Sequence, residues 1–199
     1  MSHHQHRREI TRQDVLSLDA YEAVRAEKRR DLLSVKQKRR LSVGPHATFY
    51  FENFDTMWMQ IHEMLRIEKG GEAQIKDELH AYNPLIPQGN ELVATVMFEI
   101  ADAERRKQVL NELGGVEETM TLEFDGEVIP SEPEQDVDRT TAAGKASSVQ
   151  FVHFRLTPEQ IEKFKRPGTR VVLGIHHKNY AHMTVLPEET RAELAGDLD

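Results

Sequence analysis

The feature that most constrains the fold is an order of elements that occurs twice in the C-terminal half of the chain. The apolar and turn residues of 91–130 predict a strand, a helix and two further strands, and 147–199 repeat that order before a closing helix. The expected strands are 91–100, 119–124, 127–130, 147–156, 170–177 and 181–186, and the expected helices are 103–113, 158–164 and 187–198. Two β-α-β-β units predict an α+β fold, in which an antiparallel or mixed sheet carries helices on one face.

The N-terminal part of the chain predicts helices that pack on this sheet. Residues 13–90 are expected to be mainly helical, with one strand at 47–52 and a long helix from about 20 to 40. The apolar spacing of Met57, Trp58, Ile61, Met64 and Leu65 predicts a helix that faces the core, and Gly70-Gly71 separates it from a shorter helix. We expect these two helices, at about 56–68 and 72–82, to form a helical hairpin.

Two segments have little to bury and are expected to be flexible within a single domain over residues 1–199. Residues 1–12 form a polar tail, and residues 131–146 combine Pro, Gly and acidic residues in a linker between the two units. No stretch is long and apolar enough to span a membrane, and no secretory signal is recognisable, so a cytoplasmic protein is expected.

Composition and charge exclude several classes of function. The chain has no cysteine, which excludes disulfides, a thiol nucleophile and iron–sulfur clusters held by its own thiolates. Residues 21–40 carry eight basic against three acidic residues, although the whole chain has a net charge of −8. Because only Tyr21 is aromatic in this basic segment, nucleic acid is not the expected partner. No nucleotide or flavin motif is present either.

Three long blocks of the sequence are similar to a known family. The runs VGPHATFYFENFDTMWMQIHEMLRIE (43–68), DELHAYNPLIP (77–87) and ELVATVMFEI (91–100), with the opening REITRQDVL (8–16), resemble the bacterial family of uncharacterised proteins DUF3501. The resemblance implies no established activity and no catalytic residues. It implies that members of the family are often encoded beside a rubrerythrin-like di-iron protein and an iron–sulfur oxidoreductase. A non-enzymatic accessory or interaction protein in peroxide defence or electron transfer is therefore expected.

An alternative function is a small metal-binding protein or a metal-dependent enzyme. Glu63, Glu78 and His80 would converge if the two central helices pair antiparallel, and a four-residue hairpin loop would place His177 opposite His182. No cofactor is predicted, but carboxylates with a histidine could hold a divalent metal or move a proton, and the histidine pair could share a metal. Surface carboxylates, interhelical hydrogen bonds and a solvated histidine pair are the alternatives.

The last candidate site is a partner interface at Leu85 and Ile86. These two apolar residues lie between Pro84 and Pro87, where the chain has neither a helix face nor a strand face to bury them. They therefore either fill the core of the domain or stand exposed as a contact for a partner or a second copy of the chain.

Overall fold

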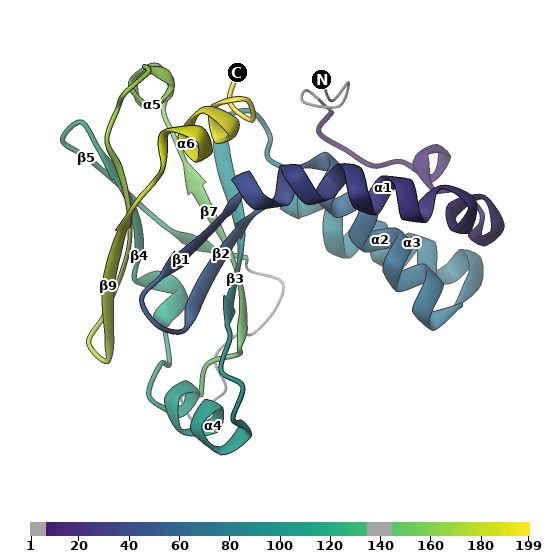
Figure 1. Ribbon diagram of the computed structural model, residues 1–199, viewed down its shortest axis with the longest axis horizontal. Helices are drawn as coiled ribbons and strands as arrows, with labels where there is room; N and C mark the ends of the chain where they lie inside the picture. The colour runs from purple at the N-terminus through teal and green to yellow at the C-terminus, as the bar shows by residue number, and fades with distance from the viewer. Residues whose placement is uncertain (1–6, 135–144) are drawn as a thin grey trace.

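The computed structural model describes residues 7–134 and 145–199 and contains two antiparallel β-sheets with helices beside them (Figure 1). The first sheet has the strand order β1-β2-β3-β7-β6, and the second has the order β5-β4-β8-β9. The strands are β1 (Arg40–Val43), β2 (Ala47–Phe51), β3 (Glu91–Phe98), β4 (Met120–Phe124), β5 (Glu127–Pro130), β6 (Glu132–Pro133), β7 (Val149–Arg155), β8 (Val171–His177) and β9 (Tyr180–Val185). The helices are α1 (Leu18–Lys38), α2 (Phe54–Glu68), α3 (Gly71–Tyr82), α4 (Ala103–Asn111), α5 (Pro158–Lys165) and α6 (Glu188–Ala195), with short 3-10 helices η1 (Arg12–Asp14), η2 (Asn83–Leu85) and η3 (Val116–Glu118). The protein has an α+β fold.

Each β-α-β-β unit divides its strands between the two sheets, where a single sheet was expected from the sequence. The first strands of the units, β3 and β7, pair antiparallel in the first sheet, with Leu92 opposite Phe154. The helices α4 and α5 then carry the chain across to the second sheet, where β4 and β8 pair antiparallel with Leu122 opposite Leu173. All four of these side chains are buried. Each sheet has one apolar inner face, and the two inner faces cover one another.

The outer face of the first sheet packs against the helical part of the chain. Figure 1 shows α1, α2 and α3 together on one side of this sheet, away from β4, β5 and β9. Met57 and Ile61 of α2 belong to one buried cluster with Val93, whose side chain lies on the outer face of β3. A smaller cluster joins Tyr21 of α1 to Met59 of α2. The helices therefore form a third layer beside the two sheets.

The described start of the chain is fixed, in contrast to the tail expected over 1–12. Ile10 is buried, and its backbone N–H and C=O both bond the side chain of Asn83. Arg8 donates to the backbone oxygens of Pro87 and Asp197. A polar composition alone did not reveal these partners, which lie far away in the sequence.

Two strands were not expected from the sequence, because each is too short to give a clear alternating pattern. Arg40–Val43 form β1 rather than the end of a helix, and Leu41 faces Phe49 across the β1-β2 ladder. Glu132–Pro133 form β6 at the start of the expected loop, and residues 135–144 of that loop lie outside the described residues. Among the described residues, no helix is long and apolar enough to cross a membrane.

Candidate functional site

The three metal-ligand candidates on α2 and α3 do not converge. The Glu63 carboxylate accepts hydrogen bonds from Arg25 at 2.7 and 2.9 Å and from the Tyr21 hydroxyl at 2.7 Å, so it joins α2 to α1. The hydrogen bonds from Arg25 lower the pKa of Glu63 to about 2, although its partial burial acts in the opposite direction. Glu78 is buried and accepts from Gln74 at 2.9 Å, whereas His80 is exposed.

The two histidines of the last hairpin are not opposite each other. The turn between β8 and β9 has two residues, Lys178 and Asn179, so the register pairs His177 with Tyr180 and Ile175 with His182. The expected four-residue loop would have required a different register. His177 accepts a hydrogen bond from the backbone N–H of Asn179 at 3.2 Å. Over residues 7–134 and 145–199, no three His, Asp or Glu side chains are arranged to hold a metal ion.

The expected interface at Leu85 and Ile86 is instead part of the core. Both side chains are 1% exposed and pack in the cluster that contains Ile10, Phe54 and Val93. The η2 turn carries the chain across the end of the helical layer, which directs both side chains inward. The core alternative left open by the sequence is therefore correct for these two residues.

A cavity of about 430 Å³ lies between the outer face of the first sheet and the helical layer. Its floor consists of outward-facing side chains of β2, β3 and β7, its wall comes from α2 and the end of α3, and the end of α1 lies at its edge. The lining residues are Lys36, Arg39, Tyr50, Phe51, Glu52, Thr56, Met57, Gln60, Tyr82, Leu85, Thr95, Met97, Val149 and Phe151. A mostly apolar cavity of this size with a few polar groups is typical of small-molecule sites.

The most unusual side chain in the cavity is that of Glu52. It directly follows β2, and strand alternation places it on the outer face together with Thr48 and Tyr50. Glu52 is 8% exposed, and its Oε1 accepts a 2.7 Å hydrogen bond from the Thr95 hydroxyl. Burial raises the pKa of Glu52 above its ordinary value, although hydrogen bonds from Thr56 and Thr95 oppose the increase. A neutral carboxyl can donate one hydrogen bond as well as accept others.

Further polar groups surround this carboxyl. The Tyr82 hydroxyl accepts a 3.4 Å hydrogen bond from Gln60, and burial raises the pKa of Tyr82. Tyr50 donates its hydroxyl proton to Glu99 at 2.7 Å. Lys36 is exposed and forms no ion pair with the part of the chain that the structure describes. The cavity thus combines apolar walls, one buried acid and a cationic edge.

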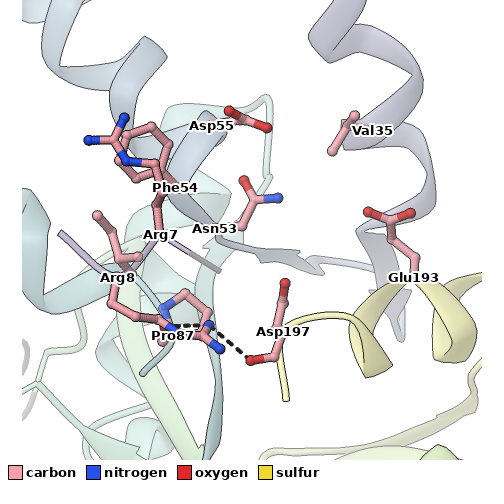
Figure 2. Close-up of a pocket in the computed structure, with 10 residues that line it drawn as sticks. Arg7, Arg8, Val35, Asn53, Phe54, Asp55, Pro87, Glu193 and Asp197 are labelled. Carbon is pink, nitrogen blue, oxygen red and sulfur yellow. Dashed lines mark hydrogen bonds between the residues drawn. The ribbon is translucent and has the colours of Figure 1, made fainter. Parts of the chain in front are cut away.

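A much smaller crevice of about 30 Å³ lies where the two ends of the chain meet (Figure 2). Arg8 donates to Pro87 O and Asp197 O, each at 3.0 Å, and the Arg7 guanidinium lies 4.3 Å from the centre of the Phe54 ring. A space of this size holds one or two water molecules. We interpret it as a structural contact that holds Arg7 and Arg8 against the C-terminal segment.

Apart from Leu85, none of the residues that line the cavity was among the candidate site residues expected from the sequence. The available signal was the alternation in ATFYFE (47–52), in which Thr48, Tyr50 and Glu52 share one face of a strand whose other face is apolar. An outward Glu next to the helix cap Asn53 would ordinarily be solvated. Its burial depends on Thr95 and Met57, which sequence reasoning did not place beside it.

Fold and cavity together define a two-sheet α+β protein with a partly open cavity of small-molecule size. The chain belongs to the family DUF3501, "Protein of unknown function", which matches residues 9–198 and confirms the resemblance seen in the sequence. A crystal structure described as a novel protein of unknown function from Burkholderia pseudomallei K96243 is similar, with 36% sequence identity and a TM-score of 0.88. The match covers 96% of this chain and 99% of that chain. No curated protein matches the sequence.

Proposed function

We propose that this protein binds a small, mostly apolar molecule in the cavity between α2 and the first sheet. The observation that carries the proposal is the Glu52 carboxyl, which is 8% exposed and lines a cavity of about 430 Å³. Protein interiors are close-packed, and both an unfilled volume and a buried acid cost folding free energy. A fold that keeps both in one place is best explained by a ligand that fills the volume and contacts the acid.

Binding is the activity that the described side chains support directly. The cavity contains no serine or histidine that could form a nucleophile and base pair. Its polar groups, Glu52, Gln60, Tyr82 and Thr95, are suited to orienting a ligand by hydrogen bonds.

The role as an accessory to a rubrerythrin-like di-iron protein and an iron–sulfur oxidoreductase stays a prediction. It follows from the family resemblance, and no contact described for this chain bears on it. The cytoplasmic location is likewise a prediction. The metal-binding alternative also stays a prediction, and the described surroundings of Glu63, Glu78 and His80 do not add support to it.

The experiment uses N-phenyl-1-naphthylamine, a neutral aromatic dye whose fluorescence rises in apolar cavities. Met97 is 37% exposed at the cavity edge, and Met183 is 55% exposed on the outer face of the second sheet. Met97→Trp should weaken dye binding by about tenfold or more, which corresponds to roughly 1.4 kcal/mol. Met183→Trp, the same substitution away from the cavity, should leave binding unchanged.

Val149→Trp provides a second obstruction, from the neighbouring strand β7. Circular dichroism checks that each variant is folded before the dye is added. The proposal is wrong if the wild-type protein does not enhance the dye fluorescence. It is also wrong if the folded cavity variants bind the dye as well as Met183→Trp does.

A further inference from the structure

We propose that the ligand is a monocarboxylate, an aliphatic chain or aromatic ring whose carboxylate meets the Glu52 carboxyl and the Lys36 ammonium. This inference rests on the proposed function and specifies the chemical class of ligand for the same cavity. Three features of the described residues carry it: the hydrogen-bonding capacity, the charge at the edge and the apolar lining.

The hydrogen-bonding groups of the cavity are better supplied with donors than with acceptors. Oε1 of Glu52 already accepts from Thr95, and burial raises the pKa of this carboxyl, which favours the protonated form that can donate to a ligand. The Tyr82 hydroxyl accepts from Gln60, which leaves its own proton to be donated. A ligand that places oxygen acceptors against these two groups satisfies both of them.

The charge at the edge of the cavity favours an anion. Arg39 also lines the cavity, but its guanidinium donates to the backbone oxygens of Phe51 and Glu52 and to the Asp197 carboxylate. Lys36 forms no ion pair with a carboxylate of residues 7–134 and 145–199, although its charge acts on Glu52 and lowers the pKa of that carboxyl. A ligand carboxylate would supply that partner and would accept from Glu52 at the same time.

Carboxylates of the chain that lie near the cavity are already occupied. Glu99 accepts from Thr48 and Tyr50, each at 2.7 Å. Glu68 and Glu78, the acids behind Tyr82, both accept from Gln74. Glu99 is in addition paired with Arg40 at 3.5 Å, and Lys36 at the edge of the cavity repels a cationic ligand.

The rest of the lining requires an apolar body on the ligand. Met57 and Leu85 form the helical side of the cavity, and Met97, Val149 and Phe151 form the sheet side. These side chains offer dispersion contacts and no hydrogen bonds, so a sugar or a dicarboxylate would lose hydration without compensation. A medium-chain fatty acid or an aromatic acid matches both parts of the cavity.

The test compares decanoate, decanol and decylammonium, which share one alkyl chain and differ only in the head group. Each compound is titrated below its micelle concentration to displace N-phenyl-1-naphthylamine from the wild-type protein. Decanoate should compete at least about tenfold better than decanol, a preference of roughly 1.4 kcal/mol. Decylammonium should compete less well than decanol.

Variants then assign the preference to its residues. Lys36→Met should abolish the preference for decanoate over decanol. Lys38→Met is the matched control on the same helix, because Lys38 pairs with Glu189 at 3.1 Å outside the cavity. Glu52→Gln should retain decanoate binding, since an amide also donates a hydrogen bond, whereas Glu52→Met should lose it.

The outcomes separate this inference from the proposed function. If the dye binds in the cavity but decanol or decylammonium competes as well as decanoate, the carboxylate inference is wrong and the binding function stands. If the dye does not bind the wild-type protein, the proposed function and the carboxylate inference are both wrong.

Discussion

The Thr95 hydroxyl on β3 donates a 2.7 Å hydrogen bond to the carboxyl of Glu52, the residue that follows β2. Glu52 extends the sheet ladder beyond β2, because its backbone N–H donates to Val93 O at 2.8 Å. Its carbonyl oxygen accepts from the buried Arg39 guanidinium at 2.9 Å. Both the backbone and the side chain of Glu52 are therefore held in place, and the carboxyl is fixed towards the cavity.

Glu52→Gln should stabilise the protein at alkaline pH. Burial raises the pKa of Glu52, so the folded protein binds this proton more tightly than the unfolded chain does. The free energy of unfolding therefore falls as the pH rises from the ordinary pKa of Glu towards the raised pKa of Glu52. Without that titration, Glu52→Gln should be more stable than the wild-type protein by about 1 kcal/mol at pH 8 and equal to it at pH 4. Urea denaturation at both pH values measures the difference.

Glu99→Gln is the control, because it should change the free energy of unfolding at pH 8 in the opposite direction. Hydrogen bonds from Thr48 and Tyr50 lower the pKa of Glu99, so its charged form stabilises the folded state. Glu99→Gln should therefore be less stable than the wild-type protein at pH 8. A stability loss for Glu52→Gln at pH 8 would contradict the assignment of Glu52 as a costly buried acid.

His153 should make the free energy of unfolding depend on pH in the neutral range. Its Nδ1 lies 3.1 Å from Glu91 and its Nε2 lies 3.1 Å from Glu134. Burial lowers the pKa of His153, but the hydrogen bonds and charges of Glu91 and Glu134 outweigh it and raise the pKa overall. The imidazolium therefore stabilises the fold below pH 6.5, and this contribution is lost as the pH rises through the raised pKa.

His153→Gln should accordingly be less stable than the wild-type protein at pH 6, by about 1–3 kcal/mol, and closer to it at pH 9. Chemical denaturation across this range measures the effect. His80→Gln, a change at an exposed histidine, is the matched control and should change the free energy of unfolding little across the same pH range. If His153→Gln retains the wild-type pH dependence, the ion pairs with Glu91 and Glu134 do not form in solution.

The order of elements could be predicted from the sequence because its signals are local. The Asp125-Gly126 turn and the Asp102 and Thr157 caps mark their elements within a few residues. The division of the strands between two sheets could not be predicted in this way. Pairing β3 with β7 joins Leu92 to Phe154, and no local pattern specifies a partner so distant in the sequence.

The surroundings of the candidate site residues could not be predicted from the sequence for the same reason. Glu63 and Glu78 have the residue type of metal ligands, but Arg25 and Gln74 satisfy them. The length of the last turn, which separates His177 from His182, is not fixed by an Asn-Gly or Asp-Gly signal. Glu52 was overlooked because its burial depends on segments from three parts of the chain.

Replacing Leu85 and Ile86 together with Ser should unfold the protein or destabilise it severely. Each side chain is buried in the cluster with Ile10 and Phe54, and truncation of one such side chain costs about 2–5 kcal/mol. Leu33→Ser, at an exposed position on α1, should change the free energy of unfolding by less than about 0.5 kcal/mol. Thermal denaturation distinguishes the two cases. A double variant with a nearly unchanged midpoint would restore the interface hypothesis for Leu85 and Ile86.

Arg39→Met should be strongly destabilising, because Arg39 lies where the end of α1 meets the C-terminal segment. The buried guanidinium bonds the Phe51 and Glu52 carbonyls and the Asp197 carboxylate, so it joins the end of α1 to β2 and to the C-terminal segment. Burial raises the pKa of Asp197, and without Arg39 that carboxyl loses its charge partner. Removing one partner of a buried pair costs about 3–5 kcal/mol.

A double-mutant cycle separates the loss of this charge pair from the loss of packing. Asp197→Asn in the Arg39→Met background should cost little, because no ion pair remains to be broken, whereas Asp197→Asn alone should be clearly destabilising. Arg40→Met, which removes an exposed arginine 3.5 Å from Glu99, should cost less than about 1 kcal/mol. Additive effects of the Arg39 and Asp197 substitutions would show that the pair does not hold the C-terminal segment. Strong non-additivity would show that the segment after α6 is held to the fold through Arg39.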